Sequence, residues 1–153
     1  MLILGIDPGL ATIGFGLVMK SGDKYRAIEY GAITTAPKQM IEKRLEEIYD
    51  SMIELLNKWH PDCMVIEELF FNNNITTAID VSMARGVILL AAQKCGVDIY
   101  EYTPLEVKSS VVGYGRAEKQ QVQYMVRLML NLNETPKPDD TADALALALC
   151  HGT

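Results

Sequence analysis

The stretch LILGIDPGLATIGFGLV, residues 2–18, decides the fold. Its first five residues, 2–6, are mostly aliphatic, which is typical of a strand buried on both faces. Asp7 follows where another apolar residue is expected, although burying a lone charge is costly. After a turn that contains Pro-Gly, residues 13–20 predict a second strand, and residues 26–35 predict a third. Because the connections are short, we expect these three strands to pair antiparallel.

The rest of the chain alternates helical and strand patterns. Helices are predicted over residues 41–59, 75–96, 117–132 and 139–151, and strands over residues 63–70 and 97–102. Crossovers of this length place the last two strands parallel to the first. We therefore expect an α/β fold with a five-stranded mixed sheet, three antiparallel strands and then two parallel ones, flanked by helices. Residues 1–153 are predicted to form a single domain.

The composition is that of an ordinary globular protein, with 49% hydrophobic and 22% charged residues, which excludes a disordered chain. We find no apolar run of the roughly 18 residues that a membrane helix needs. The first residues, MLILGID, lack the basic region of a signal peptide. The three cysteines are widely spaced and have no metal-ligand pattern, so we interpret them as reduced thiols. We expect a cytoplasmic protein without a membrane partner.

The net charge of −6 argues against nucleic-acid binding when taken alone. The charges are unevenly distributed, however. The segment 108–127 carries one acid, Glu118, and four basic residues: Lys108, Arg116, Lys119 and Arg127. Over residues 42–54 acids outnumber bases instead. A DNA-binding surface therefore remains possible.

Carboxylates interrupt core-like patterns in three separate segments. Asp7 ends the first strand, Glu67 and Glu68 break the fourth, and Asp140 and Asp143 lie on one face of the last helix. Side chains beyond the carboxyl ends of adjacent parallel strands converge. Two such charges a few ångströms apart repel by about 4 kcal/mol at an effective dielectric near 20, unless they take up protons or a cation. Oxygen ligands suit Mg²⁺ or Mn²⁺, and two such ions can activate a water and stabilise the leaving oxygen of a phosphodiester.

Each of these segments also has a purely structural interpretation. An aspartate before Pro-Gly is common in turns. Asp139 or Asp140 can cap the last helix, with Asp143 favouring its positive end. One of Glu67 and Glu68 must point to solvent, because side chains alternate along a strand. A single shared site nevertheless explains all three interruptions at once.

With these residues in view, the chain resembles the RuvC family of bacterial Holliday junction endonucleases, in the RNase H-like superfamily. The resemblance runs almost from end to end. It rests on motifs in a fixed order: GIDPG (5–9), VIEELFF (65–71), ARGVILLAA (84–92), VKSSVVGYGRAEKQQVQYMV (107–126) and DDTADALALALCH (139–151). GIDPG alone is a weak signal, but the set in this order and spacing is specific.

The resemblance implies a nuclease that resolves four-way DNA junctions by paired symmetric nicks, in homologous recombination and DNA repair, leaving 5′-phosphate and 3′-hydroxyl ends. The implied cofactor is Mg²⁺, two ions per subunit, with Mn²⁺ as a substitute. The implied catalytic and metal-binding residues are Asp7, Glu67, Asp140 and Asp143. The implied DNA-binding residues are Lys108 and Lys119 near the backbone, Phe70 against unpaired bases, and Arg116 in the basic segment.

The resemblance also implies partners. A four-way junction has approximate two-fold symmetry, so a homodimer places one active site on each of two like strands. The apolar helix at residues 75–95 is a candidate dimer surface, and a helix buried within the domain is the equal alternative. The RuvA–RuvB branch-migration complex is a further implied partner. The chain departs from many relatives in lacking a basic residue from Asn72 to Met83.

Three rival interpretations come from other classes, one of them a non-catalytic junction-binding protein, against which the intact acids argue. A YqgF-like nuclease acting on RNA or another branched nucleic acid shares the superfamily fold, and it would prefer an RNA–DNA hybrid to a junction. The N-terminal stretch also resembles the phosphate-binding hairpin of actin-like ATPases. Such proteins need a second similar half, and 153 residues hold only one.

Overall fold

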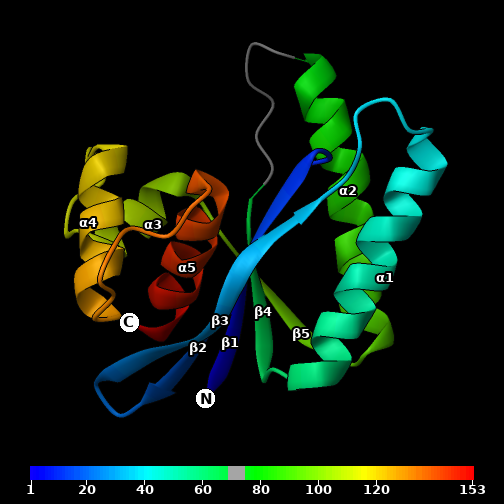
Figure 1. The fold of residues 1–153 in the computed structure, drawn as a ribbon. Helices are drawn as coiled ribbons and strands as arrows, with labels where there is room; N and C mark the ends of the chain where they lie inside the picture. The colour runs from blue at the N-terminus through cyan, green and yellow to red at the C-terminus, as the bar shows by residue number, and fades with distance from the viewer. Residues whose placement is uncertain (69–74) are drawn as a thin grey trace.

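One mixed sheet organises the structure, a computed structural model that describes residues 1–68 and 75–153. Its strands are β1 (Leu2–Asp7), β2 (Thr12–Ser21), β3 (Lys24–Thr34), β4 (Cys63–Glu67) and β5 (Asp98–Tyr102). They lie in the order β3-β2-β1-β4-β5 (Figure 1). The first three strands pair antiparallel, whereas β4 and β5 run parallel to β1. The predicted sheet is therefore confirmed.

Helices cover both faces of this sheet. On one face lie α1 (Ile41–Trp59) and α2 (Ile75–Lys94), and on the other lies α5 (Asp139–Gly152). The shorter helices α3 (Pro104–Val111) and α4 (Lys119–Met129) pack on the outside of α5. Because strand side chains alternate, the two faces form two separate cores, one under α1 and α2 and one around α5.

Helix α3 was not predicted from the sequence. It is short, and its 8 residues present too few apolar positions to show a helical period. Its start nevertheless carries a local signal, because Thr103 and Glu106 form a capping box around Pro104. The Glu106 amide donates to Thr103 Oγ1 at 3.1 Å, and the Thr103 amide donates to Glu106 Oε1 at 3.1 Å. The sequence TPLE at residues 103–106 was therefore the signal from which the start of this helix could have been predicted.

Helix α2 corrects the expectation that no segment is long and apolar enough to cross a membrane. By length and composition alone it could cross a membrane, despite the charges of Asp80 and Arg85. A core helix of a soluble protein passes the same test, so composition does not decide between the two. In the structure 28% of the apolar stretch is buried, and the buried side is packed against α1. The other side leaves large apolar residues exposed, among them Ile79 and Leu90.

Helix α5 approaches the sheet closely because the strands beneath it carry glycines. A Cβ atom at Gly5 would stand 1.9 Å from the carbonyl oxygen of Ala144, and one at Gly14 would stand 2.0 Å from that of Asp140. Only glycine permits such backbone contacts. Between Thr141 and Cys150 every residue of α5 except Asp143 is buried. The start of α5 is thus fixed beside the end of β1.

Candidate metal and nucleic-acid site

The ends of β1 and β4 place two carboxylates on the same face of the sheet. Ile6 pairs with Ile66, and both side chains belong to the core under α1 and α2. Asp7 and Glu67 each come one residue later, so both side chains face α5. Glu68 comes one residue further and is exposed. The geometry therefore places Glu67, rather than Glu68, on the side where Asp7 lies.

The first turns of α5 bring two more carboxylates to Asp7. Carboxylate oxygens of Asp7, Asp140 and Asp143 all lie within 4.8 Å of one another, close enough to hold a metal ion. The N-cap of α5 is Pro138, so neither Asp139 nor Asp140 caps the helix. The capping interpretation of Asp140 is therefore wrong, and its carboxylate belongs to this cluster.

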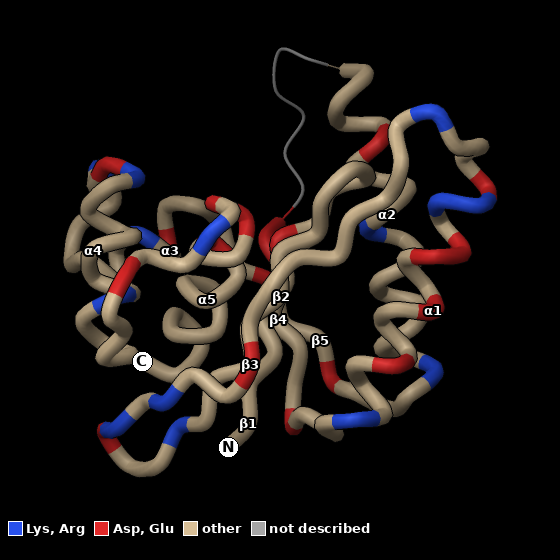
Figure 2. Tube along the Cα trace, in the orientation of Figure 1, with Lys and Arg blue, Asp and Glu red and all other residues tan. Residues whose placement is uncertain are grey.

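A cavity of about 230 Å³ opens over these groups. Asp7, Glu67 and Asp143 line it together with Lys108 and Lys119, and its remaining wall is largely apolar. Figure 2 shows the arrangement of the chain here: acidic positions lie where β4 ends and where α5 begins, although these segments are far apart in sequence. The predicted convergence of the carboxylates is present in the structure.

Three carboxyl groups of the site, those of Asp7, Glu67 and Asp143, have a raised pKa and hold protons more tightly than isolated ones. Burial, followed by the charges of Asp143, Asp140 and Glu67, raises the pKa of Asp7 to about 9. Burial is also the main cause that raises the pKa of Glu67 and of Asp143. When several buried carboxylates lie this close together, each further negative charge is unfavourable. A bound divalent cation offsets these charges and stabilises the site.

The raised pKa of Asp7 predicts how metal affinity depends on pH. The folded protein keeps a proton at Asp7 that the unfolded chain releases near the ordinary aspartate pKa of 3.8, so metal-free stability falls as pH rises from there to about 9. A cation must displace that proton. We therefore expect Mg²⁺ affinity to rise with pH, by up to about tenfold per unit, and to level off near pH 9. Calorimetric titrations of the free protein measure this slope, and a flat profile would contradict the prediction.

The four predicted DNA-binding residues have different positions. Lys108 and Lys119 line the cavity, where their charges oppose the rise in the pKa of Glu67. Arg116 is exposed on the turn between α3 and α4 and is not among the residues that line this cavity. Phe70 lies outside the described residues.

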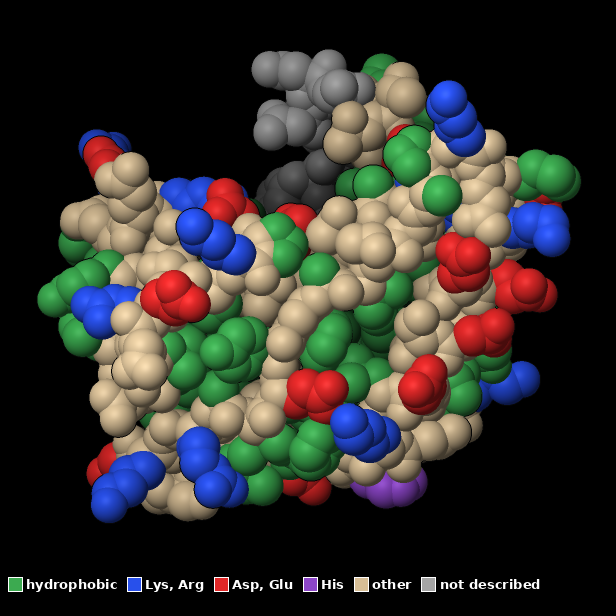
Figure 3. Space-filling view, in the orientation of Figure 1, with side chains coloured by type: hydrophobic (Ala, Val, Ile, Leu, Met, Phe, Trp, Pro, Cys, Tyr) green, Lys and Arg blue, Asp and Glu red, His purple; other side chains and the backbone are tan. Residues whose placement is uncertain are grey.

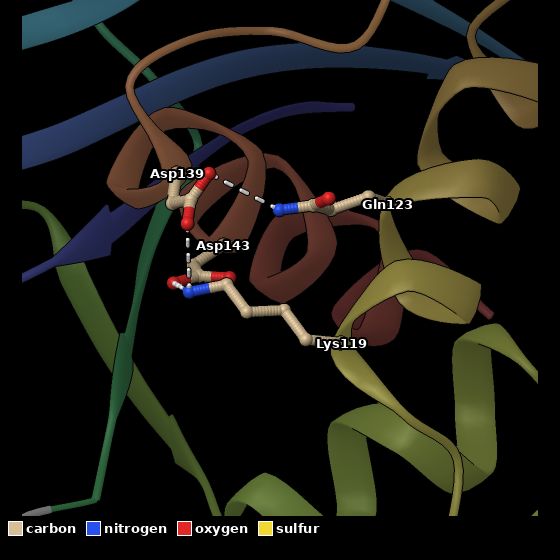
Figure 4. A network of polar contacts seen from close by, with 4 residues as sticks. All are labelled: Lys119, Gln123, Asp139 and Asp143. Atoms are coloured by element: carbon tan, nitrogen blue, oxygen red, sulfur yellow. Dashed lines mark hydrogen bonds and ion pairs between the residues drawn. The ribbon is translucent and has the colours of Figure 1, made fainter.

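One set of contacts next to the cavity was not predicted from the sequence. Lys119 forms ion pairs with two aspartates of α5, Asp139 and Asp143, and Gln123 hydrogen-bonds to Asp139 (Figure 4). The spacing of Lys119 and Gln123 places both on one face of α4, which was the available signal. No sequence pattern showed that this face meets the start of α5.

The excess of acid lies elsewhere on the molecule. Five acids of α1 are exposed: Glu42, Glu46, Glu47, Asp50 and Glu54. Figure 3 shows red acidic side chains gathered over α1 with some blue basic side chains beside them, and further blue side chains over the β2–β3 hairpin and around α4. Part of the negative net charge therefore stands apart from the cavity, and the net charge alone does not exclude nucleic acid there.

The strand order and the carboxylates at the ends of β1, β4 and the start of α5 define the class of RNase H-like nucleases. A family model described as "Crossover junction endodeoxyribonuclease RuvC" matches residues 3–151. The chain belongs to the RuvC family. This membership confirms the resemblance and decides against the YqgF-like nuclease and the actin-like half-domain.

Individual relatives agree with this assignment. Crossover junction endodeoxyribonuclease RuvC of Halothermothrix orenii is 58% identical over 152 residues, which are 99% of this chain and 92% of that protein. The structure of Thermus thermophilus RuvC in complex with Holliday junction substrate matches with a TM-score of 0.94 at 38% identity, over 99% of this chain and 93% of that one. The yeast mitochondrial Holliday junction resolvase matches with a TM-score of 0.70 at 15% identity, over 97% of this chain and 77% of that one, and shares the fold.

Proposed function

We propose that this chain is a crossover junction endodeoxyribonuclease that resolves Holliday junctions by paired symmetric nicks, in homologous recombination and DNA repair. The observation that carries the proposal is that Asp7, Glu67 and Asp143 line one cavity, with Asp140 beside Asp7 and Asp143, in a member of the RuvC family. The related Thermus thermophilus protein has been solved with a Holliday junction substrate. Residues 1–153 act as one nuclease domain in this proposal.

The donor set fits Mg²⁺ as the cofactor, with Mn²⁺ as a substitute. It consists of carboxylate oxygens alone, and burial together with the charges of the neighbouring carboxylates raises the pKa of Asp7, so a cation is needed to balance its charged form. Asp7 interacts with all three other carboxylates, so it is the residue that two ions per subunit would share. When bound, Mg²⁺ would supply an activated water and stabilise the charge on the leaving oxygen.

The two lysines of the cavity act on the phosphate in this proposal. Lys108 and Lys119 line the same cavity as the carboxylates, so a backbone phosphate that enters it meets positive as well as negative charge. Their ammonium groups offset the repulsion between phosphate and carboxylates and stabilise negative charge that develops during hydrolysis. We assign further DNA contacts to Arg116 on its exposed turn and to Phe70, in line with the family resemblance.

We propose a homodimer with α2 in its interface. The exposed side of α2 carries Ile75, Ile79 and Leu90, and Gly86 on this helix has open space where a Cβ would stand. A glycine costs an exposed helix about 1 kcal/mol relative to alanine, and a closely approaching second helix is a reason to keep it. A second copy, rather than lipid, would then cover this surface. The RuvA–RuvB complex in the cytoplasm is the further partner that the family resemblance supports.

Nicking assays on synthetic DNA test the function. With Mg²⁺, we expect the protein to cut a four-way junction symmetrically on two like strands, giving nicks that a ligase can seal. A linear duplex of the same sequence should stay intact, and so should the junction when EDTA replaces Mg²⁺. Faster cutting of an RNA–DNA hybrid than of the junction would contradict the proposal.

A further inference from the structure

Asp139 lies between α4 and the carboxylate cluster, and it contacts α4 rather than the cluster. Gln123 Nε2 donates to Asp139 Oδ1 at 3.3 Å. The other carboxylate oxygen, Oδ2, stands 3.4 Å from the ammonium nitrogen of Lys119. Figure 4 shows this arrangement, with Asp139 facing both side chains of α4. The carboxylate of Asp139 is thus held by an uncharged donor and presented to a cation.

Lys119 is shared between Asp139 and a residue of the candidate metal site. Its ammonium nitrogen stands 3.6 Å from Asp143 Oδ2, a distance close to the one that separates it from Asp139. The group of carboxylates close enough to hold one ion contains Asp143 but not Asp139. A divalent ion at Asp143 would repel the ammonium group, and Asp139 would remain as its anionic partner.

Resting on the proposed function, we propose that Asp139 is a positioning residue for Lys119. Fixed by Gln123, its carboxylate keeps the ammonium group at the rim of the cavity when Asp143 takes a metal ion. Lys119 can then leave Asp143 without leaving the site, and it stays within reach of an incoming phosphate. Asp139 itself need touch neither the ion nor the DNA.

A general effect of charge is the alternative to this role. Asp139 is an acid in the first turn of α5, where any negative charge favours the helix and attracts cations. Such an effect does not depend on Lys119, whereas positioning does. The two are separated by coupling the variants Asp139→Asn and Lys119→Met in a double-mutant cycle.

Metal binding to the free protein is the first readout. Calorimetric titration with Mg²⁺ compares the parent, each single variant and the double variant. We expect Lys119→Met to tighten Mg²⁺ binding by removing a competing cation. This gain should be about two- to fivefold larger when Asp139 is also asparagine, because the lysine then has Asp143 as its remaining partner in the pair. Equal gains in both backgrounds would overturn the proposal, and a parent that binds no Mg²⁺ would overturn it together with the metal site.

Nicking rate is the second readout, measured in single turnovers at saturating junction and Mg²⁺. Asp139→Asn should slow nicking about two- to fivefold when Lys119 is present, the scale of an exposed ion pair, and should have no further effect after Lys119→Met. Gln123→Ala should act in the same direction, and Asp139→Glu should restore part of the rate. A matched control, Asp98→Asn, removes an exposed charge at the start of β5 and should leave the rate unchanged.

Two results of the nicking assay would count against the proposal. Equal slowing by Asp139→Asn in both backgrounds would show that Asp139 acts without Lys119. If Asp98→Asn also slowed nicking, the slowing by Asp139→Asn would be explained by the change in net charge alone. A parent that binds Mg²⁺ but does not nick junctions would instead contradict the proposed function, and the calorimetric coupling would still decide whether Asp139 positions Lys119.

Discussion

Replacing Asp7 with asparagine is expected to abolish junction cutting while junction binding persists. The rate should fall on the order of 10²- to 10³-fold or more, the scale of losing one preorganised electrostatic group. Asp7 is the carboxylate whose pKa responds to all three others, so it lies at the electrostatic centre of the cluster. Asparagine keeps the size of the side chain but removes the charge that two cations would share. Nicking and gel-shift assays with the same four-way junction measure the two effects separately.

The same variant also has an expected effect on stability. Because the pKa of Asp7 is about 9, its side chain is mostly protonated at neutral pH without metal, and asparagine there resembles the state already present. Metal-free stability should therefore match that of the parent only at about pH 4 and below, where the unfolded parent is protonated as well, and the variant should be the more stable protein at neutral and higher pH. Glu68→Gln is the matched control, since Glu68 is exposed beside the site, and it should cut like the parent. Equal cutting by Asp7→Asn and the parent would remove Asp7 from the mechanism.

Gly14→Ala is expected to reduce the nicking rate strongly, although its strand, β2, carries none of the four carboxylates of the site. The new Cβ would stand 2.0 Å from the carbonyl oxygen of Asp140 and 2.3 Å from its carbonyl carbon. Both are backbone atoms that cannot rotate away, so β2 and α5 must move apart by about an ångström. A displacement of that size at a catalytic group costs about 10²-fold in rate. Overpacking of this kind also destabilises a fold by about 1–3 kcal/mol.

Gly16→Ala provides the comparison on the same strand. Its Cβ would first meet the side chain of Leu145, with Cδ2 at 2.5 Å, whereas the nearest backbone atom, Leu145 Cα, would stand at 3.2 Å. We expect it to lose stability but to keep most of its nicking rate. Urea unfolding together with single-turnover nicking separates the two effects. If Gly14→Ala folds and cuts like the parent, the close approach of α5 does not set the carboxylate positions.

The sheet could be predicted from the sequence because its strands are short apolar runs with informative ends. Asp7 and Glu67 marked where β1 and β4 stop, and parallel pairing then placed them side by side. The register between two strands depends on which side chains alternate toward each face of the sheet. This alternation is local, so it can be seen directly in the sequence. Asp140 and Asp143 could be assigned to this edge only on the assumption that the last helix packs there. The close contacts at Gly5 and Gly14 show how it does so.

Features that depend on contacts between helices could not be predicted in this way. The pairing of Lys119 with Asp139 joins α4 to α5, and no periodicity within either helix indicates their relative position. Helix α2 illustrates the same difficulty, because its composition suits a buried helix, a dimer surface or a membrane span. The structure shows that one side packs on α1 and that Ile79 and Leu90 remain exposed on the helix.

The position of α5 in the chain affects when the enzyme can act. Asp7 belongs to the first strand, whereas Asp140 and Asp143 belong to the last helix, so a ribosome translates most of the polypeptide before these groups can meet. A nascent chain that has formed only the strands holds an incomplete set of ligands. Under the proposed function, the metal site would therefore be complete only when α5 has docked beside β1.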